Sequence, residues 1–128
     1  MDARVHQDAQ GRKSVAQPCG QPCSIEQGMR ILGGKWTGSI LWHLKDGPVR
    51  FNDLSRMIGG ASKKMIAERL RQLESRGLVA RRVLKASPVS VEYTITPLGS
   101  SALDFLDQLR AWTEALPDQA RTGSAADE

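Results

Sequence analysis

The alternation of hydrophobic and polar residues predicts four helices between residues 24 and 77, separated by turns rich in glycine. The first begins at Ser24, which has the spacing of a capping box with Gln27, and it ends at Gly33. The second opens with Lys35 and Trp36, and the indole of Trp36 is expected to pack in the core. The apolar positions Ile25, Met29 and Leu32 indicate the first helix, and the second has a buried stripe of Ile40, Leu41 and Leu44.

The next two helices, on either side of Gly59-Gly60-Ala61, have the spacing of a two-helix DNA reader. We expect the shorter helix from Arg50 to Ile58 and the longer one from Ser62 to Gly77. Apolar side chains occupy one side of the longer helix and polar side chains the other. The inner side holds Ile66, Leu70 and Leu73, and the outer side holds Lys63, Lys64, Ala67, Glu68 and Arg71. Such a helix, held by a shorter one, suits a DNA major groove.

Runs of β-branched residues then predict a two-stranded ribbon from residues 79–84 and 91–95. The link between them is long and contains Pro88, which indicates a protruding wing rather than a tight hairpin. Thr96 has the position of an N-cap before Pro97, and a long final helix closed by Pro117 is expected to follow. The predicted fold is mainly α with a small β-wing: a winged helix-turn-helix whose N- and C-terminal helices form a dimer interface.

Residues 23–117 are expected to form one domain between a flexible N-terminal arm, residues 1–22, and a disordered tail, residues 118–128. The arm has no apolar core of a signal peptide and the chain has no membrane-length apolar run, so we expect a cytoplasmic protein without a membrane partner. Its two cysteines would be reduced there. A formal net charge of +4 fits a nucleic-acid partner without requiring one.

The first and last predicted helices carry apolar faces wider than so small a core can cover. Part of each face packs within one subunit, and we expect the excess to form the interface of a homodimer. The residues assigned to that interface are Met29, Leu32, Leu103, Leu106, Leu109 and Trp112. Two-fold pairing would place the two reading helices ~34 Å apart, on successive major grooves. The alternative is that the two helices cover each other within one chain.

Six short motifs occur in the order in which they are found in one family of regulators. They are Cys23-Ser24-Ile25-Glu26, Gly33-Gly34-Lys35-Trp36, residues 47–54, residues 70–79, Val91-Glu92-Tyr93 and Thr96-Pro97-Leu98-Gly99. Through them the chain resembles HxlR-type transcriptional regulators, a branch of the winged helix-turn-helix proteins related to MarR. The resemblance implies a homodimer on a palindromic operator. It also implies that some members sense quinones, hypochlorite or aldehydes through the cysteine near the N-terminus.

On the reading helix, Lys63, Lys64 and Arg71 are the first candidates for contacts to guanine edges or phosphates. Ser62 lies at the helix N-terminus, where backbone amides favour a phosphate, and Ala67 is small enough to meet a thymine methyl. The alternative is a solvated helix face without a partner. The ordered motifs favour DNA.

The resemblance assigns Lys35 and Arg50 to the DNA backbone. In the family an arginine commonly precedes the Val-Glu-Tyr motif and enters the minor groove, but this chain has Ser90 there. That departure leaves Lys85 as the best wing contact. Glu92 and Tyr93 are expected to hold the strand to the body rather than to contact DNA.

Cys23 occupies the sensing position of the family, at the start of a helix, where backbone amides can stabilise a thiolate. Cys19, four residues earlier, is a candidate resolving thiol. The alternative is two incidental cysteines at the end of the arm. His6 and His43 do not have a ligand spacing with the cysteines, so no metal and no cofactor are expected.

These features predict a sequence-specific DNA-binding regulator, acting as a repressor and responsive to oxidants or electrophiles through Cys23, with double-stranded DNA and a second copy as partners. The small-molecule effector is unknown. An enzyme is not expected, because the sequence has no phosphate-binding loop, nucleophile elbow or catalytic pair of carboxylates or histidines. The alternative is a winged-helix module that binds another protein and not specific DNA.

Overall fold

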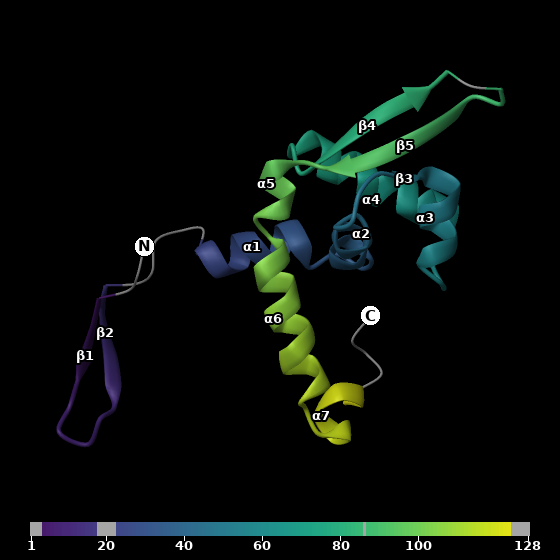
Figure 1. Cartoon of the computed structure of the whole chain (residues 1–128). Helices are drawn as coiled ribbons and strands as arrows, with labels where there is room; N and C mark the ends of the chain where they lie inside the picture. Colours follow the sequence, from purple (N-terminus) through teal and green to yellow (C-terminus); the bar gives the residue numbers. More distant parts are fainter. Residues whose placement is uncertain (1–3, 18–22, 86, 124–128) are drawn as a thin grey trace. The chain divides into compact units, whose positions relative to one another are not determined.

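The computed structural model describes residues 4–17, 23–85 and 87–123 of the 128-residue chain (Figure 1). These residues divide into two compact units, Met1–Gly34 and Lys35–Glu128. The division falls immediately after the glycine pair that was predicted to end the first helix.

The first unit contains an antiparallel hairpin and one helix. Strand β1 (Arg4–Gln7) pairs with β2 (Lys13–Gln17), and helix α1 spans Ser24–Leu32. In the connecting turn the Asp8 carboxylate accepts backbone N–H groups from Gln10 and Arg12, at 3.0 and 2.8 Å. No regular structure was predicted here, because residues 1–22 show no apolar period. The turn is instead held by a polar side chain. The flexibility of the arm stays a prediction.

The capping box predicted at the start of α1 is wrong. Ser24 already lies inside the helix, and Cys23 is the N-cap, with an extended backbone and no side-chain cap bond. The N-cap is the residue directly before the first helical turn. In the structure that residue is Cys23, so the side chain of Ser24 cannot cap the helix. The Cys23 carbonyl instead accepts the N–H of Gln27 at 2.9 Å.

The second unit is a helical body with a three-stranded antiparallel sheet (Figure 1). Its helices are α2 (Thr37–His43), α3 (Phe51–Met57), α4 (Lys63–Ser75), α5 (Pro97–Ser100), α6 (Leu103–Glu114) and α7 (Asp118–Thr122). Its strands are β3 (Val49–Arg50), β4 (Val79–Leu84) and β5 (Ser90–Ile95), in the order β3-β5-β4. The sheet therefore joins the wing to the chain that enters α3.

The core of the second unit lies among α2, α3 and α4. Its fully buried side chains are Ile40, Leu41, Leu44, Leu54, Ile66, Leu70 and Leu73. The inner faces predicted for the second and fourth helices are thus confirmed, as are the two wing strands. Two predicted N-caps are confirmed as well: Ser62 Oγ accepts the N–H of Met65 at 3.1 Å, and Thr96 Oγ1 accepts that of Gly99 at 3.0 Å.

Several predicted boundaries differ from the structure. Helix α2 begins at Thr37 rather than Lys35, because Trp36 has a left-handed backbone with φ +77°. The final helix is broken into α5 and α6, since Ala102 bonds back to Gly99, three residues away, at 3.1 Å. The helix ends at Glu114, and Pro117 is the N-cap of α7 instead of a terminator. Helix α7 occupies five residues of the tail that we expected to be disordered.

Candidate nucleic-acid interface

The amphipathic character of α4 separates an inner face from an outer basic face. Ile66, Leu70 and Leu73 are buried, whereas Lys63, Lys64 and Arg71 are exposed to solvent. Ala67 is half-buried between the two faces, and the N-cap Ser62 is exposed. The outer face of α4 therefore presents three cations and a capped N-terminus, as a major-groove helix requires.

The three predicted phosphate contacts outside α4 are all exposed, and all belong to the second unit. Lys35 precedes α2, and its Nζ lies 5.4 Å from the ring centroid of Trp36. Arg50 is the N-cap of α3 and lies opposite Glu92 in the β3–β5 pair. Lys85 follows the last residue of β4, on the ribbon that extends beyond α3 in Figure 1. The partly buried Trp36 also agrees with its predicted packing role.

A groove of about 670 Å³ lies between α3 and the wing, and three arginines line it: Arg50, Arg56 and Arg81. Arg56 forms an ion pair with Asp53 on the same helix. Of these three, only Arg50 was predicted to contact DNA, because Arg81 reaches the groove through the β3–β5–β4 pairing. No local pattern in the sequence signals that pairing.

Wing residues that were assigned to structure rather than contact lie as expected. Tyr93 is buried at 8% exposure and pairs with Val49 on one side and Arg81 on the other. Glu92 lies 3.9 Å from Arg82 across the ribbon. Both residues therefore fix the base of the wing.

A second missed residue is Arg69, on the half-buried flank of α4. Its Nε donates to the backbone carbonyl of Lys35 at 2.9 Å, and its Nη1 donates to Gln72 Oε1 at 3.3 Å. The sequence shows only one more cation on a basic helix, so nothing in it distinguishes Arg69 from Arg71.

The apolar residues assigned to a dimer interface are partly exposed. On α1, Met29 is 53% exposed and Leu32 is half-buried. On α6, Leu109 and Trp112 are exposed, and Leu103 is half-buried.

Leu106 is an exception among the assigned interface residues. It is 8% exposed and lines a groove with Trp42 of α2, so it packs within its own chain. The exposed stripe of α6 instead begins with Phe105, which was not assigned to the interface and has the spacing i, i+4, i+7 with Leu109 and Trp112.

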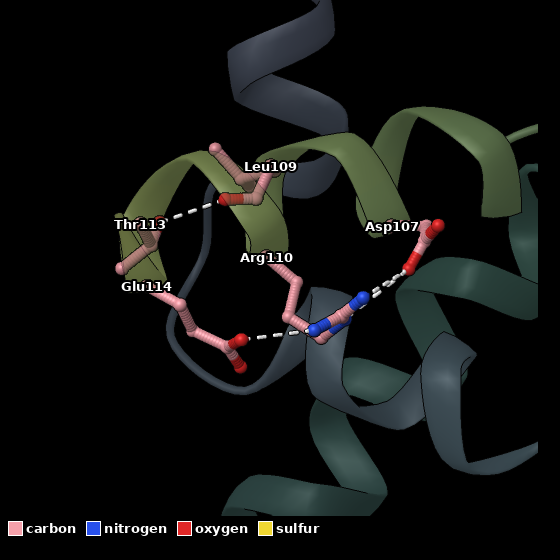
Figure 2. Close-up of polar contacts among 5 residues, drawn as sticks. All are labelled: Asp107, Leu109, Arg110, Thr113 and Glu114. Atoms are coloured by element: carbon pink, nitrogen blue, oxygen red, sulfur yellow. Dashed lines mark hydrogen bonds and ion pairs between the residues drawn. The ribbon is translucent and has the colours of Figure 1, made fainter. Parts of the chain in front are cut away.

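The charged groups of α6 bond along the helix itself (Figure 2). Arg110 donates to Asp107 at 2.8 Å and to Glu114 at 3.0 Å. These hydrogen bonds raise the pKa of Arg110, and the bond to Asp107 contributes the most. Thr113 Oγ1 donates to the Leu109 carbonyl at 2.8 Å. Arg110, Asp107, Glu114 and Thr113 are thereby partnered within the helix, whereas the apolar side chains of Phe105, Leu109 and Trp112 are exposed.

Of the two cysteines, Cys23 is half-buried at the N-cap of α1, and Cys19 lies outside the described residues. Within residues 4–17, 23–85 and 87–123, no three His, Cys, Asp or Glu side chains are grouped so as to hold a metal ion. None of the helices in these ranges is long and apolar enough to cross a membrane.

Comparison with known proteins identifies relatives over most of the chain. An HTH-type transcriptional regulator of Methanothermobacter thermautotrophicus is 41% identical over 90 residues, which is 70% of this chain and 69% of the relative. The regulator YodB of Bacillus subtilis is 39% identical over 90 residues, which is 70% of this chain and 80% of YodB. The curated relatives are transcriptional regulators, not enzymes.

Solved structures agree with this assignment. A MarR-family regulator from Porphyromonas gingivalis W83 superimposes with a TM-score of 0.73 at 30% identity, over 79% of this chain and 99% of that one. The redox regulator HypR in its oxidised form gives 0.70 at 34% identity, over 75% and 99%. Quinone-bound YodB from Bacillus subtilis gives 0.62 at 34% identity, over 72% and 97%.

The helix-turn-helix of α3 and α4, the ribbon beside it and the helix that follows all fall within one family model. That model, the HxlR-like helix-turn-helix, matches residues 31–121. The chain therefore belongs to the HxlR-like family of helix-turn-helix transcriptional regulators.

Proposed function

We propose that this regulator binds a palindromic operator as a homodimer, inserts α4 into the major groove, and represses transcription. The observation that carries the proposal is the separation of faces on α4, where Lys63, Lys64 and Arg71 are exposed while the opposite side is buried. Ala67 lies between the two faces, where a thymine methyl can reach it.

The phosphate contacts of the proposed complex come from segments that precede and follow α4 in the chain. Lys35 precedes α2, Arg50 caps α3, and Lys85 lies on the wing, and all three are exposed. Contacts of this kind fix the register of a reading helix without selecting a sequence. If each subunit neutralises about three phosphates, the logarithm of affinity should fall with log salt at a slope of about −5 for the dimer.

The proposed homodimer uses the exposed stripes of α1 and α6. Met29 on α1 and Leu109 and Trp112 on α6 are large apolar side chains exposed by 41% or more. A helical stripe of this kind marks an interaction surface, and a two-fold axis is the commonest way to cover it. Leu32 and Leu103, which are also assigned to the interface, are half-buried.

A gel shift on the DNA upstream of the gene tests the proposal. We expect a shift on a palindromic sequence, and Lys63→Ala with Lys64→Ala should weaken it at least about 30-fold, since each lost contact costs about 1 kcal/mol or more. The matched control is Arg76→Ala with Arg121→Ala, which removes two exposed charges elsewhere and should leave binding nearly unchanged. Equal loss in both pairs, or a salt-independent shift, would contradict specific binding by α4.

A transcription assay from the same promoter separates repression from activation. Repression predicts that reporter output rises when the regulator is removed. Capture of a protein partner without any operator binding would instead favour the alternative, an interaction module.

We also infer that Cys23 makes operator binding sensitive to oxidants or electrophiles. Two relatives support this: HypR is described as a redox regulator, and YodB has been solved with a bound quinone. Cys23 is the N-cap of α1, where helix amides favour a thiolate. Cys19 is the proposed resolving thiol, either in the same chain or across the dimer.

Titration of the operator complex with hypochlorite or a quinone tests this inference. Cys23→Ser should keep its affinity at oxidant levels that release the parent, because the reacting sulfur is gone. Cys19→Ser should still react but should form no disulfide. Identical titration curves for Cys23→Ser and the parent would rule out thiol sensing.

A further inference from the structure

The strained residue of the second unit lies where α2 begins. Trp36 has φ +77°, a conformation that non-glycine residues rarely adopt because Cβ then approaches the following carbonyl. Such a residue persists only when its surroundings hold it in place. Two contacts provide that support, and both come from the helix-turn-helix.

The first contact is the hydrogen bond from Arg69. Its Nε lies 2.9 Å from the carbonyl oxygen of Lys35, the residue directly before Trp36. A second donation, from Arg69 Nη1 to Gln72 Oε1 at 3.3 Å, links the same guanidinium to α4 itself. The planar guanidinium therefore ties the Lys35 backbone to the reading helix.

The second contact is between the indole and the turn that precedes α4. A Cβ built on Gly60 would lie 3.3 Å from Trp36 Cη2, so the ring packs directly against this turn. Gly60 itself has φ +92°, which also favours glycine there. The start of α2 is thus fastened to both the turn and the helix of the DNA reader.

We infer that Arg69 is a positioning residue for DNA binding, which rests on the proposed function. Arg69 holds the Lys35 carbonyl in place. It thereby fixes the distance between the phosphate bound by the Lys35 ammonium and the bases read by α4. Phosphate contacts give a reading helix its register only when their spacing from it is constant. Arg69 supplies that constant spacing without touching DNA.

A double-mutant cycle separates this role from a direct phosphate contact. Arg69→Met keeps an unbranched apolar stem but removes the charge and the donors, and it should lower operator affinity by about 10-fold. Lys35→Gln alone should lower affinity similarly. Combined, they should lose far less than the product, because the lysine contact is already misplaced in Arg69→Met. Because the dimer loses one phosphate contact in each subunit, the magnitude of the salt slope should fall by about two in either variant and no further in the pair.

The matched cycle uses Lys85→Gln on the wing, which should combine with Arg69→Met multiplicatively, within about 2-fold. Arg76→Met, at the end of α4, controls for the loss of one charge. Arg69→Leu, which also removes the charge and the donors and favours a helix, replaces Arg69→Met in the cycle if the latter does not fold.

The inference is overturned if Arg69 and Lys35 combine multiplicatively, or if the pair loses about four units of salt slope, since Arg69 would then contact phosphate itself. Full affinity in Arg69→Met would overturn it equally. Failure of the parent to bind any operator would be a failure of the proposed function, visible before any variant is made.

Discussion

At the residue scale, two glycines differ in how much space surrounds the position of a Cβ atom. Gly99 is buried at the start of α5, and a Cβ there would lie 2.1 Å from the Leu78 carbonyl oxygen and 2.8 Å from Ile95 Cγ1. Gly59, in the turn between α3 and α4, has no atom beyond its chain neighbours within 4 Å of a Cβ built there. The same substitution therefore has very different consequences at these two positions.

We predict that Gly99→Ala destabilises the fold by about 1–3 kcal/mol, because the backbone carbonyl of Leu78 must move to admit the methyl group. Urea unfolding followed by circular dichroism measures the change. Gly59→Ala is the control, and it should stay within about 0.5 kcal/mol of the parent. Comparable losses in both variants would show that the α5 contact does not set the cost.

At the scale of the element, the N-terminus of α4 combines a structural and a proposed functional role in one side chain. Ser62 Oγ accepts the N–H of Met65 at 3.1 Å, which satisfies one of the donors left unpaired at a helix start. The same end of the helix is proposed to face a phosphate. A carboxylate would preserve the first role and oppose the second.

We therefore predict that Ser62→Ala loses about 1 kcal/mol of stability, whereas Ser62→Asp keeps the cap and nearly the full stability. Operator affinity should follow a different order. Ser62→Asp should bind more weakly than Ser62→Ala, because its negative charge repels the phosphate. Melting curves and gel shifts on both variants give the two rankings, and the same ranking in both would place α4's N-terminus away from DNA.

At the scale of the whole molecule, the apolar stripe of α6 is the main feature that a single chain leaves uncovered. Phe105, Leu109 and Trp112 are exposed on a helix whose polar groups bond to one another. Exposed aromatic and leucine side chains in a row are typical of the centre of an interface.

We predict that Leu109→Asp with Trp112→Asp weakens the homodimer at least about 30-fold, since a buried charge and a lost aromatic anchor both oppose association. Sedimentation velocity over a range of concentrations measures this. Val89→Asp, at a similarly exposed apolar residue on the wing, is the control and should leave the assembly unchanged. A parent that sediments as a monomer would contradict the proposed dimer.

How much the sequence could predict depended on how local each interaction is. The buried face of α4, its Ser62 cap and the strands of the wing were predictable, because their patterns lie within a few residues. Strand β3 and the bond from Arg69 to Lys35 were not, since both join segments far apart in the chain. The break between α5 and α6 was missed because their apolar spacing continues across it.

The candidate site divides in the same way. Exposed cations on α4 follow from helical spacing alone, whereas the arginine groove depends on the sheet that brings Arg81 beside α3. The left-handed Trp36 runs against backbone preference, and only contacts made after folding stabilise it.

The two residues of β3 connect the wing directly to the helix-turn-helix. Val49 and Arg50 are in register with Tyr93 and Glu92, so the root of the ribbon and the entry to α3 are parts of one hydrogen-bonded sheet. A duplex that bends the ribbon tip would therefore tilt Arg50 as well. The width of the DNA groove at the wing would then change the contact between Arg50 and the sugar-phosphate backbone. The protein would thereby respond to sequence-dependent DNA shape without contacting a base.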